Sequence, residues 1–444
     1  MAVKATLSGF PEWLPAGRVV EQDVLDTTRR IFELHGFASL ETRSVEPVDV
    51  LMRKGEVDKE IYAVRRLHGD DDAGLALHFD LTVPFARYVV ENAGQLTFPF
   101  RRYQIQKVWR GERPQEGRFR EFTQADIDIV DVDRLATHHD AEMAIVMADV
   151  FAALPLPPTV ILLNNRKVLE GFYRGLGITD TGAVLRGIDK LDKIGRDKVR
   201  ALLLDAGLDE RQADLCLDLA DIQSGDGSFV SRVRDLGVTD PLLDEGLSEL
   251  SAVVEAVNAR RPGAARADLH IARGLDYYTG TVYETQVVGH ESFGSVCSGG
   301  RYDALASDGK TTYPGVGISL GVTRLVSLLL GRDLVRVTRA VPSAVLIAVP
   351  DESTRSASDA VAHALRRRGI ACEVAPAADK FGKQIRYADR RGIPYVWFPN
   401  ADGDTVKDIR SGEQMGADAA TWAPPDTDLR PRVVAVTDMD KGAS

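Results

Sequence analysis

The sequence predicts an α+β chain: a mostly antiparallel sheet flanked by helices, interrupted by a helical insertion and followed by a small mixed α/β domain. Three observations carry this prediction. Two strand-like runs, 103–110 and 119–130, flank the polar loop GERPQEGR, which is typical of a long-looped antiparallel hairpin. Residues 164–262 are rich in Leu, Ala, Asp, Lys and Arg at helical spacing. Beyond residue 343, strand and helix patterns alternate.

Composition sets the broad class. At roughly 100–200 residues per domain, a chain of 444 residues suggests two to four domains. No run approaches the roughly 18 uninterrupted apolar residues of a membrane-spanning helix, so we expect no membrane partner. The cysteines at 216, 297 and 372 are far apart and form no CxxC pair, which favours a reducing cytoplasm without disulfides or a cysteine zinc site.

The remaining elements follow from local patterns. Residues 18–36 have apolar positions near helical spacing and end at Gly36, a plausible residue just after a helix. Residues 75–81 alternate like a strand, and Pro84 then suits the first turn of a helix. Strand signals return at 268–288, and 314–330 reads as a strand followed by a helix.

The hairpin concentrates positive charge in a chain of net charge -11. Between positions 101 and 120 lie six arginines and one lysine: Arg101, Arg102, Lys107, Arg110, Arg113, Arg118 and Arg120. A planar guanidinium such as that of Arg110 can grip a phosphate with two hydrogen bonds, and the loop can reach a second anionic group. The alternative is a solvated hairpin with surface ion pairs.

The second strand of the hairpin has two different faces. Ala125, Ile127 and Ile129 fall on one face and suit a core, whereas Gln124, Asp126 and Asp128 fall on the other and offer an amide and two carboxylates.

Three further segments carry candidate site residues. In HFDLTVPFARY, Asp80 and Thr82 are expected to share a strand face and bind a cationic amine, or else to form a charged strand end with a Thr cap. In ARGLDYYTGTVYE, Arg273 stands beside Tyr277 and Tyr278, although a turn with two packed tyrosines has the same pattern. In GVGISLGVTRL, small residues leave room for a ligand before Arg324, or form a buried packing corner.

Two tempting motifs fail. Residues 309–311 read GKT, but a phosphate-binding loop of the GxxxxGK[ST] type needs glycine where Ala304 stands. His138 and His139 have no matching set of metal ligands, so any metal-binding residues stay unknown at this stage.

These segments, in this order, resemble those of the class II aminoacyl-tRNA synthetases, and specifically the histidyl-tRNA synthetase family. VWRGERPQEGRFREF is similar to motif 2 and GVGISLGVTRL to motif 3 of that class. ARGLDYYTGTVYE and SGGRYDAL resemble two peptides peculiar to the histidine enzymes. The resemblance runs from about Gly9 into the C-terminal domain. It departs at Arg43, which stands where motif 1 usually has a proline, and in Asp80 and Asp128, where many bacterial members have Glu.

The resemblance implies a role for each matching residue. Arg110 and Arg273 would be catalytic and flank the α-phosphate, and Arg110, Arg118 and Arg324 would bind ATP. The histidine-binding set would be Asp80, Thr82, Gln124, Asp128, Arg273, Tyr278 and Tyr302. Arg113 and Gln115 would face the acceptor end of tRNA.

The resemblance also implies the domains and the function. It gives a catalytic domain in two parts, an insertion, a linker and an anticodon-binding domain: residues 1–163, 164–262, 263–334, 335–342 and 343–444. The enzyme would activate L-histidine with ATP and Mg²⁺ and transfer it to tRNA(His), as a cytoplasmic homodimer with no DNA partner. Near 380–391, Lys380, Lys383, Arg386, Arg390 and Arg391 would meet the anticodon, unless they form an ordinary solvated helix face.

Two rival functions have the same overall pattern. Regulatory subunits of ATP phosphoribosyltransferase resemble these enzymes but typically lack the anticodon domain and the catalytic arginine, whereas Arg273 and about a hundred residues after the catalytic segment are present here. A non-catalytic tRNA-sensing module would bind tRNA without exchanging pyrophosphate, and would not need Asp128, Tyr278 and Arg273 together.

Overall fold

The computed structural model describes residues 7–52, 58–68, 74–272 and 277–436, and the chain forms two compact units. The first comprises Met1–Pro11 and Val24–Leu328, and the second comprises Glu12–Asp23 and Leu329–Ser444. The finer domain boundaries given above stay a prediction.

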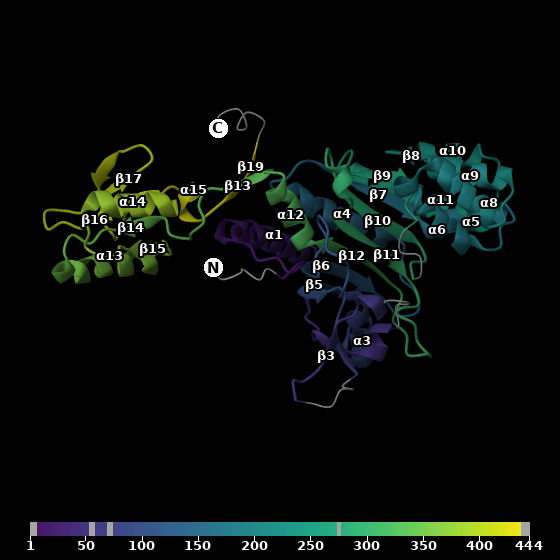
Figure 1. Cartoon of the computed structure of the whole chain (residues 1–444), viewed down its shortest axis with the longest axis horizontal. Helices are drawn as coiled ribbons and strands as arrows, with labels where there is room; N and C mark the ends of the chain where they lie inside the picture. Colours follow the sequence, from purple (N-terminus) through teal and green to yellow (C-terminus); the bar gives the residue numbers. More distant parts are fainter. Residues whose placement is uncertain (1–6, 53–57, 69–73, 273–276, 437–444) are drawn as a thin grey trace. The chain divides into compact units, whose positions relative to one another are not determined.

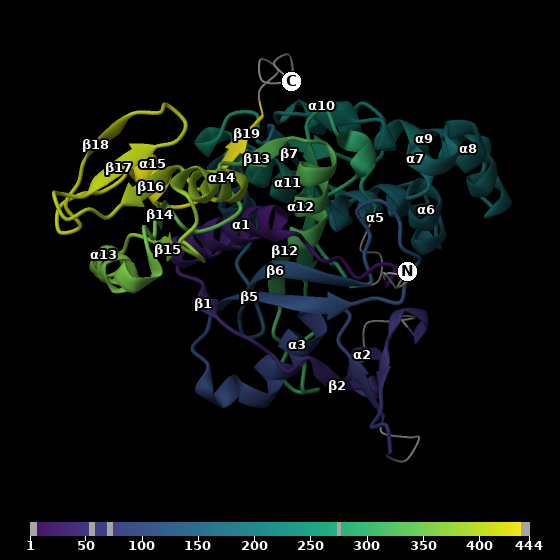
Figure 2. The ribbon, with the colours of Figure 1, turned by 60° about the vertical axis from the view of Figure 1, so that its left-hand side comes forward.

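A large sheet organises the first unit (Figures 1 and 2). Its neighbouring strands are antiparallel, apart from the parallel pairs β1–β5 and β7–β9. Its order in space is β1 (Ala38–Ser39), β5 (Phe100–Trp109), β6 (Glu121–Val130), β12 (Gly315–Gly321), β11 (Cys297–Tyr302), β10 (Thr281–Val287), β7 (Thr159–Asn165), β9 (Ala265–Asp268) and β8 (Gln223–Ser224).

The predicted hairpin is confirmed as β5 and β6, which pair antiparallel from Phe100↔Val130 to Trp109↔Glu121. The expected core face of β6 is fully buried at Ala125, Ile127 and Ile129. The polar face is buried as well, with Asp126 and Asp128 only 3% and 2% exposed. Buried carboxylates require hydrogen-bond or ion-pair partners, so the other polar groups on this face of the sheet are expected to contact them.

A smaller sheet and the helix after it correct one expectation. The strands are β2 (Val45–Pro47), β3 (Ala63–Val64) and β4 (Leu75–Leu77), and β4 ends before Asp80. Thr82 begins α3 (Thr82–Asn92), so Asp80 and Thr82 do not share a strand face. The carboxylate of Asp80 accepts a hydrogen bond from the backbone N–H of Val83, and Pro84 fits the first helical turn, so the helix starts here.

Up to residue 331, the other α-helices described outside the 164–262 segment are α1 (Pro15–Leu34), α2 (Val48–Leu51), α4 (His138–Ala153) and α12 (Val322–Gly331). Helix α1 corresponds to the helix predicted at 18–36, but it begins earlier, at Pro15, and ends at Leu34. In α4, Asp140 is bound by Arg301 of β11 and by Thr281 and Tyr283 of β10, which ties the helix to the sheet.

The 164–262 segment is helical as its spacing predicts, and it lies beside the β7–β9–β8 edge of the large sheet (Figures 1 and 2). Side-chain caps begin several of its helices: Asn165, Asp180, Asp209 and Asp240 each accept a backbone N–H in the first turn. The helices are α5 (Arg166–Gly175), α6 (Thr181–Ile188), α7 (Leu191–Ile194), α8 (Arg196–Asp205), α9 (Glu210–Ala220), α10 (Ser228–Arg234) and α11 (Pro241–Arg260).

The second unit contains the predicted α/β alternation. Its sheet has the order β15 (Cys372–Val374), β14 (Val345–Ile347), β16 (Tyr395–Phe398), β17 (Thr405–Asp408) and β18 (Gln414–Gly416). Helix α13 (Arg355–Arg367) packs on the face that carries Val345 and Trp397, and α14 (Phe381–Arg391) packs on the face that carries Leu346 and Val396. A short helix, α15 (Asp426–Leu429), follows.

Part of the expected linker at 335–342 is a strand instead. β13 (Val335–Val337) pairs antiparallel with β19 (Val433–Ala435), near the end of the chain. A pairing partner so distant in sequence leaves no signal in the composition around residue 335, which explains why the segment reads as a linker.

Candidate active site

The site is built on one face of the large sheet, where directly opposed residues on antiparallel strands share a side. One row across this face contains Arg102, Asp128, Gly317 and Gly300. The next row contains Gln104, Asp126, Ser319, Ser298 and Glu284. We call these two rows, together with Gln124, the polar face.

A cavity of about 430 Å³ opens over this face. Five of the sequence-predicted residues line it: Arg110, Arg118, Gln124, Tyr278 and Arg324. Two carboxylates, Glu112 and Glu284, also line it. Three guanidinium groups around one cavity suit a ligand that carries several negative charges.

A much smaller pocket of about 20 Å³ lies on the same face and brings together Thr82, Asp128, Tyr278 and Tyr302. Tyr278, Ser298, Gly299 and Ser319 line both spaces, so the pocket adjoins the cavity. The structure therefore brings a polar, tyrosine-lined pocket next to a basic cavity.

Asp128 is held from two sides in the small pocket. The hydroxyl of Tyr302 donates to its Oδ1 at 2.7 Å, and Nη2 of Arg102 lies 2.7 Å from its Oδ2. Burial, and then the nearby carboxylate of Asp128, raises the pKa of Tyr302 well above its ordinary value, so the phenol remains a donor. A carboxylate has about four lone-pair directions, so one carboxylate can accept several hydrogen bonds at once.

Gln124 and Asp126 are joined through a serine. Nε2 of Gln124 donates to Oγ of Ser319 at 2.7 Å, and Ser319 also hydrogen-bonds the Asp126 carboxylate. Burial raises the pKa of Asp126 from 3.8 to about 7, against the lowering effect of Arg102 and Ser319. Within the described parts of the chain, Oε1 of Gln124 and Oδ1 of Asp126 are buried and accept no hydrogen bond.

Asp80 lies close to this group although it lines neither space. It is 3% exposed, and its charge contributes to the pKa of Asp126 and of Tyr277. Tyr277 in turn donates to the hydroxyl of Tyr278 at 2.9 Å.

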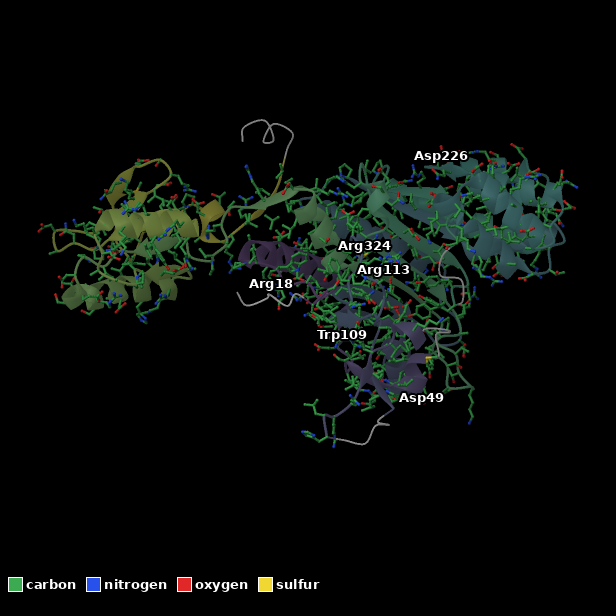
Figure 3. All side chains as sticks on the ribbon, in the orientation of Figure 1. Arg18, Asp49, Trp109, Arg113, Asp226 and Arg324 are labelled. Carbon is green, nitrogen blue, oxygen red and sulfur yellow. The ribbon has the colours of Figure 1, made fainter. Side chains whose placement is uncertain are left out.

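The arginines of the cavity are braced by neighbouring groups. Nε of Arg110 donates to the carbonyl of Phe79 at 2.9 Å, and its guanidinium lies over the ring of Phe122. Arg324, on α12 (Figure 3), has its guanidinium over the ring of Phe293. The β5–β6 loop packs on that same ring, because a side chain at Gly117 would lie 2.5 Å from Phe293.

Arg113 and Gln115 lie on the exposed loop between β5 and β6, and Figure 3 marks Arg113. Neither residue lines the cavity. Gln115 and Arg118 pair through their backbones around Gly117, whose φ is 68°. Arg273, the remaining predicted site residue, lies outside the described residues.

Six of the seven cations in the hairpin's basic cluster divide into two groups, and the seventh, Arg120, donates from Nε to the backbone carbonyl of Glu112 at 3.1 Å. Arg110, Arg113 and Arg118 face the cavity or solvent. Arg101 pairs with Glu142, Arg102 with Asp128, and Lys107 with Glu121, so these three cations stabilise the protein rather than face an anionic ligand. The hairpin therefore combines both interpretations of its charge, because some of its arginines line the cavity and other cations form ion pairs within the protein.

Several residues of the polar face escaped sequence reasoning as parts of the site, among them Arg102, Ser319 and Glu284. A signal existed for Arg102, because Arg102, Gln104 and Gln106 repeat at the strand period of two and match the polar positions of β6. No comparable signal marks Ser319 or Glu284.

Comparisons with known proteins find similarity to one family over nearly the whole chain. The family model for histidyl-tRNA synthetase matches residues 9–325, and the model for an anticodon binding domain matches residues 343–401. The chain is 60% identical to a histidine–tRNA ligase of Cutibacterium acnes, with 98% of this chain and 99% of the relative covered. It is 59% identical to the histidine–tRNA ligase of Micrococcus luteus, with 99% and 100% covered.

Solved structures show the same likeness. The histidyl-tRNA synthetase of Nostoc sp. PCC 7120 has a TM-score of 0.85 and 36% identity, with 94% of this chain and 98% of that chain covered. A protein of Bacillus halodurans described as an ATP phosphoribosyltransferase regulatory subunit/histidyl-tRNA synthetase has a TM-score of 0.72 at 17% identity, with 86% and 96% covered, and shares the fold.

Proposed function

Because the chain belongs to the histidyl-tRNA synthetase family, we propose that its basic cavity and adjoining small pocket are the site of histidine activation. The protein is a histidine–tRNA ligase, an aminoacyl-tRNA synthetase that uses ATP. It joins L-histidine to ATP as histidyl-adenylate with release of pyrophosphate, and then transfers histidine to the 3′-terminal adenosine of tRNA(His). The observation that carries the site proposal is the polar face itself, which lines both spaces through Ser298 and Ser319.

The small pocket, together with the part of the cavity that adjoins it, would take the imidazole. Asp128 would accept an imidazole N–H, and Tyr278 would contact the other ring nitrogen, with Tyr302 and Arg102 holding the Asp128 carboxylate in place. Any other side chain would leave these buried polar groups without partners, which is a strong basis for rejecting it. Asp80, Thr82 and Gln124 would bind the α-ammonium group.

The cavity would take the nucleotide. An oxygen of the histidine carboxylate attacks the α-phosphorus, and the bond to the bridging oxygen breaks so that pyrophosphate leaves. The attacking carboxylate is already ionised, so the step needs positioning and charge stabilisation rather than a strong base. Arg110, Arg118 and Arg324 would supply that charge, together with Arg273 by family resemblance.

Mg²⁺ fits this donor set. It prefers oxygen ligands and often takes one or two carboxylates, completing its shell with phosphates and water. Glu112 and Glu284 are the carboxylates that line the cavity, and within the described ranges no cluster of three His, Cys, Asp or Glu residues forms a ready-made cage. When bound there, the ion would neutralise phosphate charge.

The tRNA would meet both units. The exposed Arg113 and Gln115 would face the acceptor end, and the basic face of α14 would face the anticodon. We also place the enzyme in the cytoplasm as a homodimer. No described helix has the length and apolar character needed to cross a membrane.

Amino-acid-dependent ATP–pyrophosphate exchange tests the proposal. Wild type should exchange with histidine and with no other natural amino acid. Asp128→Ala and Arg110→Ala should each lower exchange on the order of a hundredfold or more, since each removes a charged contact to the reacting ligands. Asp131→Asn is the control, because Asp131 follows the same strand but lines neither space. Exchange that persists in Asp128→Ala and Arg110→Ala would place the site elsewhere.

A further inference from the structure

A three-residue hydrogen-bond chain on the polar face contains Gln124 and two residues, Asp126 and Ser319, that have no role in the proposed reaction so far. Asp126 on β6 stands directly opposite Ser319 on β12, and Gln124 lies two residues before Asp126. Ser319 lies between both neighbours: its Oγ accepts from Nε2 of Gln124 at 2.7 Å, and its hydroxyl lowers the pKa of the Asp126 carboxyl, which is the effect of a hydrogen bond to the ionised form. All three residues line the cavity or the small pocket.

The number of hydrogens fixes the direction of this chain. A serine hydroxyl has one hydrogen to donate, and an ionised carboxylate can only accept. Ser319 must therefore donate to ionised Asp126, and it can then only accept from Gln124. This leaves one orientation for the Gln124 amide, with its nitrogen on Ser319 and its oxygen turned away.

The amide oxygen that remains is an available acceptor. Oε1 of Gln124 is buried and accepts no hydrogen bond from any described residue. An ammonium group is a donor only, so an amide oxygen binds it, whereas an amide NH₂ in the same place would oppose it.

We propose that Asp126 is a positioning residue for histidine binding: acting through Ser319, it holds the Gln124 amide with its oxygen facing the substrate α-ammonium group. This inference deepens the proposed function and rests on it. Asp126 touches no reacting atom in this scheme. Its effect reaches the substrate only through the orientation of a neighbouring amide.

The charges around Asp126 make the chain sensitive to pH. Arg102 on β5 favours the ionised form, whereas Asp128 on β6 and Asp80 before α3 disfavour it, and burial disfavours it most. A protonated Asp126 can donate to Ser319, whose hydroxyl is then free to turn towards Gln124 and release the amide. Amine recognition should therefore be strongest above pH 7.

Binding of two histidine analogues, one with the amine and one without it, to the full-length protein at pH 8 tests the inference; each variant is compared with wild type for the same analogue. Histidinol keeps the amine of histidine, whereas imidazole-4-propionate lacks it. We expect Asp126→Asn and Ser319→Ala each to lower the affinity for histidinol on the order of tenfold to a hundredfold, which is the loss typical of a hydrogen bond to a charged group. The affinity for imidazole-4-propionate should change less than about threefold in the same variants. Ser319→Thr keeps the hydroxyl and should therefore retain most of the wild-type affinity for histidinol. In a Gln124→Ala background, Asp126→Asn should have no further effect.

The alternatives give different results. Equal losses for the two ligands would mean that Asp126 only maintains the pocket, and unchanged histidinol binding would remove Asp126 from recognition; either would overturn the inference. If the proposed function itself were wrong, wild-type protein would show neither histidinol binding nor histidine-dependent exchange. The circular-dichroism melting curve of each variant separates loss of folding from loss of binding, and Ser319→Ala tests the chain if Asp126→Asn does not fold.

Discussion

Asp126 shows at the scale of one residue how burial and function oppose each other. A carboxylate that loses its water is costly to ionise, and burial raises the pKa of Asp126 to about 7. The nearby Arg102 and the hydroxyl of Ser319 offset part of that cost. The residue therefore keeps its proton to a much higher pH than an ordinary surface aspartate does.

This pKa predicts a pH-dependent stability. Between about pH 4 and 7, the unfolded chain releases the Asp126 proton while the folded chain keeps it, so the free energy of unfolding falls as pH rises. The full effect is at most on the order of 4 kcal/mol. Asp126→Asn removes it, so the melting temperature of the variant minus that of wild type should increase from pH 5 to pH 8. A difference that stays constant with pH would show that Asp126 titrates normally.

At the scale of elements, the glycines of β11 and β12 let aromatic and acidic side chains lie flat on the sheet. A Cβ at Gly317 would be 2.1 Å from Oδ1 of Asp128, and one at Gly300 would be 2.6 Å from the ring of Tyr278. A Cβ at Gly315 would be 2.5 Å from the ring of Tyr302. These glycines are needed for close approach, since bulkier residues would displace the groups that form the small pocket.

The substitution Gly317→Ala should accordingly lower the catalytic efficiency with histidine more than it changes the KM for ATP. Because the added methyl must displace the Asp128 carboxylate, we expect kcat/KM for histidine in pyrophosphate exchange to fall on the order of a hundredfold or more, with KM for ATP changed only slightly. Gly94→Ala is the control, because no atom of a described residue outside its chain neighbours lies within 4 Å of a Cβ there. Unchanged histidine kinetics in Gly317→Ala would argue against Asp128 as the imidazole ligand.

The elements also show what the sequence could and could not predict. The hairpin, the 164–262 helices and the C-terminal alternation follow from local periodicity, and the structure contains all three. The prediction that Asp80 and Thr82 share a strand face was wrong, because a helix begins at Thr82 although the short stretch before it alternates like a strand. Ser319 escaped notice because its partner Gln124 is 195 positions away, and only the strand register brings them together. Motif resemblance identified candidate residues, but the network that orients them depends on tertiary structure.

At the scale of the whole molecule, each of the two units has its own core and its own candidate surface. The first holds the cavity and small pocket, and the second presents the basic residues of α14. Lys380, Lys383, Arg386, Arg390 and Arg391 are all exposed, with Lys383 paired to Asp379 and Arg391 to Glu373. A surface of this kind suits a polyanion although the chain as a whole is acidic.

The double variant Arg386→Ala/Arg390→Ala separates the tasks of the two units. KM for tRNA in aminoacylation should rise and its salt dependence should flatten, by about 0.7–0.9 in the log–log slope for each phosphate that is no longer neutralised. Histidine-dependent pyrophosphate exchange should not change, because that step needs no tRNA. Arg367→Ala is the matched control, since this exposed arginine lies on α13, which covers the opposite face of the same sheet. Equal tRNA kinetics in both variants would mean that α14 is only a solvated helix face.

The central claim is that the polar face of the large sheet orients histidine for attack on ATP. A crystal structure with a non-hydrolysable histidyl-adenylate analogue, the sulfamoyl adenosine of histidine, tests it most directly. The account predicts the imidazole on Asp128 in the small pocket, the ammonium about 3 Å from Oε1 of Gln124, and the sulfamoyl group beside Arg110. An ammonium bound to Asp128, or an analogue bound away from this face, would contradict it.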